Sequence, residues 1–342
     1  MTTTLSQASL MQAFQGTNHS IPVWFFRQAG RYLPQYRAIR EKHTLTEMFQ
    51  NPDIVTEVTC LPVKILNVDA AILFADILTL PGRMGFKINF DKSEGPVIAN
   101  PVQSSADIKK IRDFEDLDYI AQAVEAVNRN LSQTVPLIGF AGSPFTVACY
   151  LIEGGSSTSF NKTLKLMHAQ PTVFHQLMEK LTINTIDYLN LQKNAGIHVF
   201  QVFDTWAGIL TPNDYLEFVL PYVRMIFAKV DLPSIYYIKN GRHLLSLIEA
   251  IEFDFLSVCS NVLLGEDLAS GRFQRGIQGN LHPSMLYADD KVLGREVMDI
   301  VGRVRMYKKF IFNLSQGLYP DVDWEKLRFV VQKVHEMSWK RE

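Results

Sequence analysis

Short apolar segments alternate along this chain with longer amphipathic ones. Seven apolar runs bounded by turn-forming residues predict strands at 69–74, 137–140, 198–203, 234–238, 253–258, 276–278 and 309–313. Most of these runs are followed by a loop and then by apolar residues at three- and four-residue spacing, as in 172–194 and 289–308. Repeated strand–helix units predict an α/β fold with a parallel sheet covered by helices.

The number of strands leaves two architectures open. A closed (β/α)8 barrel of the TIM type needs eight strands, and residues 22–26 are a candidate for the missing one, whereas an open doubly wound sheet needs no eighth strand. Residues 82–100 contain Pro, Gly and charged residues and are interpreted as a hairpin excursion. No low-complexity stretch or long linker divides the chain, so we predict a single domain over residues 1–342.

Composition narrows the class of protein. The chain has 342 residues, of which 47% are hydrophobic and 20% charged, and its formal net charge is −1. This balance indicates a globular protein with a sizeable core and argues against a nucleic-acid binder, which usually carries a basic stripe. The first residues lack a basic leader and no apolar run is long enough to cross a bilayer, so we expect a cytoplasmic protein without membrane contacts.

The cysteines give no sign of a disulfide framework or a zinc site. Cys60, Cys149 and Cys259 lie far apart, with no Cys-x-x-Cys or Cys-x-His pairing. We expect reduced, mostly buried thiols and no bound metal.

Two arginines close to the N-terminus are the first candidates for ligand binding. Arg27 and Arg31 flank Gly30, and aromatic residues and a proline surround them. A guanidinium is always charged and offers planar bidentate donors, so this segment is suited to holding carboxylates, and Gly30 lets the backbone approach a ligand closely. An ordinary solvated loop is the alternative.

Further polar residues follow predicted strands, at the end of a barrel where active sites lie. They are Asp76, Asp204, Thr205 and Asn313. Residues 140–146 lead from a strand through a turn into a helix that carries Tyr150. The alternatives are helix caps for Asp76, Asp204 and Thr205 and a plain strand–helix turn for 140–146.

Four blocks of sequence occur in the order typical of one enzyme family. They are Arg-Gln-Ala-Gly-Arg-Tyr-Leu-Pro at 27–34, Phe-Ala-Asp-Ile-Leu at 74–78, residues 139–155, and Gln-Gly-Asn-Leu at 278–281 with Pro283, Leu286 and Tyr287. Over residues 21–324 the chain resembles the uroporphyrinogen decarboxylases. The resemblance implies a carboxy-lyase on a (β/α)8 barrel, usually a homodimer, that needs no cofactor or metal. Such an enzyme removes CO2 from the four acetate side chains of uroporphyrinogen III and gives coproporphyrinogen III for haem.

The resemblance also implies roles for single residues. Asp76, Arg27 and Tyr150 match the catalytic positions of the family. The positions expected to bind substrate are Arg27, Gln28, Ala29, Gly30, Arg31, Asp76, Tyr150, Thr205 and Gln316. A pyrrole ring protonated at carbon can accept the electron pair left by CO2, and the Asp76 carboxylate would stabilise that cation. Arg27 is suited to binding a carboxylate, whereas its role in proton transfer stays open because the pKa of a guanidinium is so high.

Three positions depart from the family pattern. Gln316 replaces the usual histidine; it can donate a hydrogen bond but cannot carry a positive charge near neutral pH. Cys259 stands where an aspartate followed by tryptophan is expected, and Phe26 replaces methionine.

Two other functions are alternatives to the decarboxylase. A methyltransferase of the same superfamily would use a zinc-bound thiolate, and the cysteines and eight histidines show no matching ligand spacing. A tetrapyrrole-binding paralogue with weak activity is suggested by Gln316 and Cys259. Because Arg27, Arg31, Asp76 and Tyr150 are all present, we expect an active enzyme.

Overall fold

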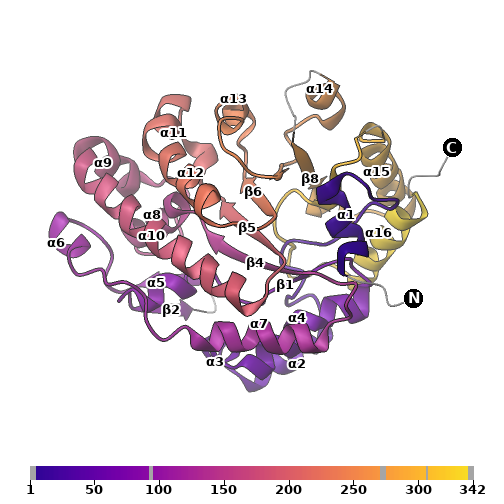
Figure 1. Cartoon of the computed structure of the whole chain (residues 1–342), viewed down its shortest axis with the longest axis horizontal. Helices are drawn as coiled ribbons and strands as arrows, with labels where there is room; N and C mark the ends of the chain where they lie inside the picture. The colour runs from indigo at the N-terminus through magenta and orange to yellow at the C-terminus, as the bar shows by residue number, and fades with distance from the viewer. Residues whose placement is uncertain (1–4, 92–94, 270–274, 306, 338–342) are drawn as a thin grey trace.

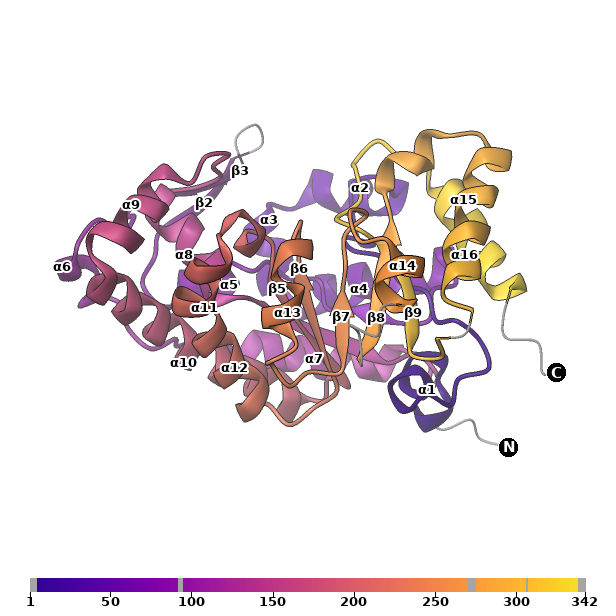
Figure 2. The same ribbon diagram turned by 90° about the horizontal axis from the view of Figure 1, so that it is seen from above.

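The computed structural model describes residues 5–91, 95–269, 275–305 and 307–337 of the chain. In these residues, seven parallel strands form one curled sheet in the order β1-β4-β5-β6-β7-β8-β9 (Figures 1 and 2). The strands are β1 (Ala71–Ile72), β4 (Leu137–Gly142), β5 (Val199–Asp204), β6 (Ser234–Ile238), β7 (Phe255–Ser257), β8 (Gly276–Leu281) and β9 (Phe310–Leu314). All seven strands predicted from the sequence are thereby confirmed.

Helices surround the curled sheet on its outside (Figure 1). They are α1 (Ser9–Gln15), α2 (Pro34–Lys42), α3 (Leu45–Gln50), α4 (Pro52–Leu66), α5 (Thr79–Arg83), α6 (Ser105–Ile108), α7 (Asp118–Asn130), α8 (Pro144–Glu153), α9 (Asn161–Ala169), α10 (Pro171–Ala195), α11 (Pro212–Phe218), α12 (Leu220–Lys229), α13 (Leu245–Ile248), α14 (Leu264–Ala269), α15 (Asp290–Arg303) and α16 (Trp324–Glu336). The predicted helix 172–194 is α10, and the predicted helix 289–308 is α15, which ends earlier, at Arg303. Within the described residues, no helix combines the length and apolarity that a membrane crossing requires.

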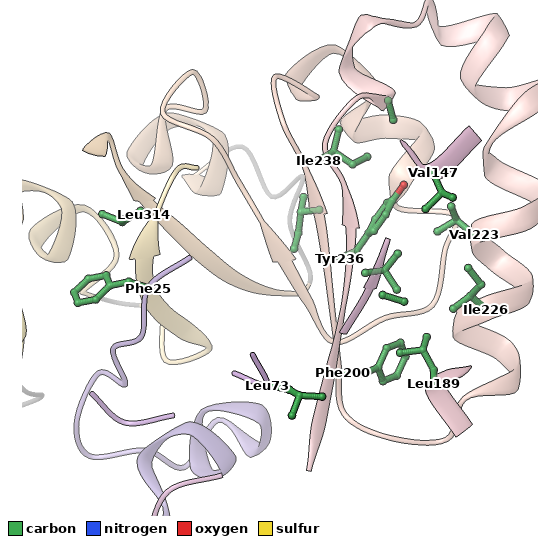
Figure 3. Close-up of a cluster of buried hydrophobic side chains, with 14 of the residues drawn as sticks. Phe25, Leu73, Val147, Leu189, Phe200, Val223, Ile226, Tyr236, Ile238 and Leu314 are labelled. Carbon is green, nitrogen blue, oxygen red and sulfur yellow. The ribbon is translucent and has the colours of Figure 1, made fainter. Parts of the chain in front are cut away.

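The alternation of side chains along each strand divides the apolar residues into two clusters. Phe200 and Tyr236 point from their strands toward Val223 and Ile226 of α12, in the layer between sheet and helices (Figure 3). The neighbouring positions point inward, where side chains from separate strands meet in a second cluster. This inner cluster includes Trp24, Ile138, Val199, Ile235, Tyr237, Phe255 and Ile311. The strands therefore pack on one another across an interior, which does not fit the alternative of an open doubly wound sheet.

Helix α1 covers the end of this interior that is formed by the amino ends of the strands. Its Leu10 and Ala13 belong to the inner cluster, and the ring of Phe14 lies 4.6 Å from that of Phe255, centroid to centroid. The opposite end, formed by the carboxyl ends of the strands, carries the candidate active site.

The segment 22–26 lies between the two edges of the sheet. Val23 forms a parallel bridge with Phe312 of β9, and its carbonyl accepts a hydrogen bond from the N–H of Asp69, just before β1 (2.8 Å). Side chains provide other partners: the N–H groups of Val23 and Phe25 donate to the Asp69 carboxylate (2.7 Å) and to the Gln28 amide oxygen (3.1 Å). Because side chains take the places of some main-chain partners, this candidate for the eighth strand makes a single bridge to β9 and no regular strand.

The hairpin predicted within 82–100 is present. Strands β2 (Ile88–Asp91) and β3 (Gly95–Ile98) pair antiparallel. Val97 also bridges to Gly155 at the end of α8, where a side chain on residue 155 would lie 2.7 Å from the Pro96 carbonyl oxygen. This contact attaches the hairpin to the helix that carries Tyr150.

Candidate active site

The arginine segment follows Phe26 at the open end of the sheet and is held by Gln28. The Gln28 side chain is fully buried; its oxygen accepts the N–H of Phe25 (3.1 Å) and its nitrogen donates to the carbonyl of Ala70 (3.0 Å). The hydroxyl of Tyr32 donates a hydrogen bond to the main-chain carbonyl of Gln28. The Gln28 amide is thus used within the protein, and its part in the site is to fix the loop that presents Arg27 and Arg31.

Main-chain donors in this loop face no protein acceptor. Among the described residues, the N–H groups of Ala29 and Gly30 have no hydrogen-bond partner, and both residues are partly exposed. A side chain at position 30 would lie 3.0 Å from the carbonyl oxygen of Arg27, so glycine suits this tight turn. Adjacent N–H groups without a protein acceptor, beside two arginines, are donors that an anion can use.

Arg27 adopts a left-handed conformation, with φ of 59°. Burial raises the pKa of Asp76, Tyr150 and Tyr237, and the positive charge of the exposed Arg27 opposes the rise at each of them. Arg31 lies further along the loop and is exposed. Its main-chain carbonyl accepts a hydrogen bond from Arg37 Nη1 (2.8 Å). The structure therefore brings Arg27 within electrostatic range of the Asp76 carboxylate and leaves the Arg31 residue exposed.

Asp76 follows β1 and is partly exposed. Its Oδ1 accepts the N–H of Leu78 (2.8 Å), and its own N–H donates to Thr79 Oγ1 (3.3 Å). Burial raises the pKa of Asp76, and the Leu78 N–H and the Arg27 charge oppose that shift. The carboxylate closes a turn just before α5, but the N-cap of that helix is Leu78 and has no side-chain cap, so the alternative of a helix cap is wrong for Asp76.

Tyr150 lies on α8 beside this carboxylate. Burial raises the pKa of Tyr150, the charge of Asp76 raises it further, and the Trp206 indole and Arg27 lower it. The rings of Tyr150 and Trp206 have their centroids 6.2 Å apart, yet the buried indole N–H has no acceptor at hydrogen-bonding geometry in the described residues. Tyr150 at neutral pH is a phenol whose hydroxyl can donate to an acidic group.

The prediction that Asp204 shares the rim with Thr205 is wrong. Asp204 is 0% exposed and lies in the layer between sheet and helices, where Thr146 Oγ1 and the Tyr236 hydroxyl both donate to it at 2.8 Å. Burial raises the pKa of Asp204 to about 6, although these donors lower it. The cause is strand alternation: Phe203 points inward and Asp204 outward, and Thr205 is partly exposed beyond them.

Asn313 also lies elsewhere than predicted. It was expected to add an amide to the rim, but it is 0% exposed, points into the interior and accepts the N–H of Phe26 with its Oδ1 (3.0 Å). Gln316, two residues after β9, is partly exposed, and its Nε2 donates to the hydroxyl of Tyr319 (3.1 Å). Only the second of these amides lies near the surface.

Aromatic side chains pack together next to Arg27, and of these the sequence had drawn attention to Phe26 alone, as a departure from the family pattern. Phe26 contacts Tyr237 and Phe203 edge to face, with centroid distances of 4.8 and 5.4 Å, and Phe140 contacts Phe203 at 5.5 Å. Inward positions at the ends of β5 and β6 would have indicated this apolar floor. It lowers the local dielectric, so charges above it interact more strongly.

Cys259 follows β7 and joins three strand ends. Its buried Sγ accepts the N–H of Asn240 (3.3 Å) and donates to the carbonyl of Ser315 (3.3 Å). All three cysteines are free and buried, as predicted. Among the described residues there is no group of three or more His, Cys, Asp or Glu side chains that could hold a metal ion.

Comparison with known proteins identifies the family of this chain. Residues 5–337 match the family described as uroporphyrinogen decarboxylase (URO-D). The chain is 40% identical over 323 residues to a uroporphyrinogen decarboxylase from Carboxydothermus hydrogenoformans, covering 93% of this chain and 92% of the relative. It is 41% identical over 329 residues to one from Geobacter sp. strain M21, covering 94% and 96%.

Solved structures extend the comparison to the fold alone. A methyltransferase from Methanosarcina mazei superimposes with a TM-score of 0.80 at 18% identity, covering 98% of this chain and 99% of that one. A B12-independent methionine synthase from Shewanella sp. W3-18-1 gives 0.59 at 10% identity, covering 84% and 87%. The full-length family match and the close relatives lead to one conclusion: this chain belongs to the uroporphyrinogen decarboxylase family.

Proposed function

We propose that this chain is a uroporphyrinogen decarboxylase that removes CO2 from the four acetate side chains of uroporphyrinogen III and yields coproporphyrinogen III. The observation that carries the proposal is the family match over residues 5–337, together with relatives of that name at about 40% identity. The meeting of Arg27, Asp76 and Tyr150 at one end of the sheet supports it. The step belongs to porphyrin and haem biosynthesis.

Substrate carboxylates are held by the arginine loop. The guanidinium groups of Arg27 and Arg31 and the free N–H groups of Ala29 and Gly30 all donate hydrogen bonds, and the substrate carries eight carboxylates to accept them. Thr205 and Gln316 add polar groups near the rim. Binding at several carboxylates fixes the ring that reacts.

Asp76 stabilises the positive charge that the reaction creates. A pyrrole protonated at a ring carbon becomes a cation; the bond to the carboxylate then breaks, CO2 leaves, and the electron pair neutralises the ring. A proton is finally delivered to the side-chain carbon, which becomes a methyl group, and the ring gives up the proton first gained. The Asp76 carboxylate lies close to the apolar floor and to Tyr150. It is suited to accept hydrogen bonds from pyrrole N–H groups during these steps.

We also propose that residues 22–26 close the curled sheet into a (β/α)8 barrel as its eighth element. Main-chain hydrogen bonds join Pro22 and Trp24 to Phe312 of β9, and Val23 bonds to Asp69 shortly before β1; these contacts with both edges of the sheet support closure. A single domain and a cytoplasmic location are proposed from the sequence patterns, and a homodimer from the family resemblance. Light scattering of the purified chain tests the dimer.

An anaerobic assay with uroporphyrinogen III tests the function. After oxidation, separation of the porphyrins by carboxylate number should show a ladder from eight to four without added metal or cofactor. Saturable binding without loss of carboxylates would instead identify the tetrapyrrole-binding paralogue. In that case the reversions Gln316→His and Cys259→Asp are the first variants to assay.

A further inference from the structure

In the loop after β9, Gly317 leaves space for the side chain of Arg27. A Cβ atom placed on Gly317 would lie 2.7 Å from Cδ, 3.0 Å from Nε and 3.2 Å from Cγ of Arg27. These three atoms of Arg27 are the nearest neighbours of that position. Arg27 therefore lies directly against the main chain of residue 317, in space that any larger residue would fill.

The backbone just before Arg27 is held by the same part of the chain. The N–H of Phe26 donates to Asn313 Oδ1 (3.0 Å), and the carbonyl of Phe26 accepts the N–H of Leu318 (3.2 Å). A non-glycine residue in the left-handed region is disfavoured by roughly 1 kcal/mol, so the φ of 59° at Arg27 needs such support. Asn313 and Leu318 thus fix where the Arg27 side chain begins.

The loop cannot easily move away from Arg27. The carbonyl of Ser315 accepts hydrogen bonds from the Tyr237 hydroxyl (3.1 Å) and from Cys259 Sγ (3.3 Å), and the N–H of Ser315 donates to the carbonyl of Leu281 (2.8 Å). Three strands, β6, β7 and β8, therefore hold the position from which Gly317 meets Arg27.

We propose that Gly317 is a positioning residue that sets where the Arg27 guanidinium meets a substrate carboxylate. The absence of a side chain at 317 lets the stem of Arg27 lie flat on the loop, while Asn313 and Leu318 fix its backbone. The inference rests on the proposed function, in which Arg27 binds substrate. It adds that the last strand and its loop, rather than the arginine segment alone, determine the geometry of this contact.

Gly317→Ala tests the proposal with little risk to the fold. The φ of Gly317 lies outside the region that L residues avoid, so alanine fits the backbone, and the flexible arginine stem moves more readily than the anchored loop. A misplacement of about 1 Å at a substrate contact can reduce the rate by about 100-fold. We expect Gly317→Ala to lower kcat/KM for uroporphyrinogen III by about 10- to 100-fold, mainly through KM, with the melting temperature unchanged.

The matched control is Gly302→Ala. Gly302 lies in α15, and a Cβ there would meet nothing within 4 Å. The same chemical change at this site should leave kcat/KM at the wild-type value. Equal losses in the two variants would overturn the proposal.

A double-mutant cycle distinguishes a failure of the Gly317 inference from a failure of the proposed role of Arg27 in substrate binding. We expect Gly317→Ala to have no further effect on kcat/KM once Arg27 is replaced by alanine, because the side chain that it displaces is gone. If Gly317→Ala lowers kcat/KM by the same factor in both backgrounds, Gly317 acts elsewhere and this inference is overturned, although Arg27 keeps its role. Wild-type kcat/KM in Arg27→Ala would instead remove Arg27 from the proposed function, and the inference with it.

Discussion

At the scale of single residues, Asp76 combines two demands that oppose each other. The proposed chemistry needs its carboxylate charged, and burial favours the neutral acid. The Leu78 N–H and the charge of Arg27 recover part of the cost of that burial. A charge retained in a site of reduced dielectric interacts strongly with a nearby cation.

Replacement of Asp76 by asparagine should therefore reduce turnover by a factor on the order of 100 to 1,000, because the charge is lost and the shape is kept. The melting temperature should change little. The control is Asp290→Asn, on the exposed face of α15, which removes only an ion pair to Lys326 and should leave turnover unchanged. Turnover near the wild-type value in Asp76→Asn would remove this residue from the mechanism.

The raised pKa of Asp76 also predicts a pH dependence. The active form is the carboxylate, so activity is present above the pKa and is lost as the pH falls through it. We expect the acid limb of the profile of kcat/KM against pH to lie above the ordinary pKa of an aspartic acid. The limb should be absent from the residual activity of Asp76→Asn; its persistence there would assign it to another group.

The residue at position 316 predicts a second pH dependence, that of KM. Its amide, held by Tyr319, keeps the same charge at every pH, whereas histidine gains a positive charge as the pH falls through about 6.5. Gln316→His should therefore make KM lower at pH 6 than at pH 8 through attraction of substrate carboxylates. A KM with the wild-type pH dependence in this variant would show that residue 316 does not meet a carboxylate.

At the scale of elements, β5 shows how one strand serves two purposes. Its inward residues support the site, while its last residue, Asp204, joins the strand to the surrounding helices. Thr146 of α8 and Tyr236 of β6 both donate to Asp204, and Thr146 Oγ1 also accepts the N–H of Trp206. Asp204 therefore keeps α8, which carries Tyr150, in register with the loop that carries Thr205.

This buried carboxyl predicts how stability changes with pH. The pKa of Asp204 is raised to about 6 in the folded protein, so the folded state binds a proton that the unfolded chain has already released. The stabilisation is present at low pH and is lost as the pH rises through about 6. Relative to Asp204→Asn, the free energy of unfolding of the wild type should fall by about 2 kcal/mol from about pH 4 to about pH 8.

Urea denaturation at several pH values measures this difference. Asp187→Asn, at an exposed position on α10, should run parallel to the wild type. Parallel curves for the wild type and Asp204→Asn would show that the carboxyl does not titrate with a raised pKa.

At the scale of the whole molecule, one carboxylate joins segments from both ends of the chain. Asp69 accepts hydrogen bonds from Ser9 of α1 (3.1 Å), from the N–H of Val23 (2.7 Å) and from His335 of α16 (2.8 Å). It lies directly before β1, at the seam that Val23 bridges. The seam of the sheet is therefore stabilised by both the first and the last helix.

The hydrogen bond to Asp69 raises the pKa of His335, and the charge of Asp69 adds to that shift against the effect of burial. Because the pKa of His335 is higher in the folded protein than in the unfolded chain, its protonation stabilises the folded state at low pH. This stabilisation is lost as the pH rises through the pKa of the folded protein. His335→Ala should thus lower the melting temperature more at pH 6 than at pH 9. The exposed His19, replaced by alanine, should show no such difference; an equal loss at both pH values for His335→Ala would indicate a packing effect alone.

The sequence by itself determined the order of the elements and the family. Buried parallel strands are short apolar runs between turn residues, and the arginine segment and the Asp76 block are contiguous in the chain, so local patterns suffice to find them. It also placed Arg27, Asp76 and Tyr150 near strand ends, since each follows a strand or a strand–helix turn.

Tertiary structure decided which neighbouring residues face the site. Asp204 and Asn313 looked like rim residues, but strand register turned one outward and the other into the interior. Register is set by pairing with strands distant in sequence, and a shift of one residue reverses every side chain. For the same reason, no local pattern could reveal that Gly317 leaves the space that Arg27 occupies: that contact exists only because β9 lies beside the first segment of the sheet.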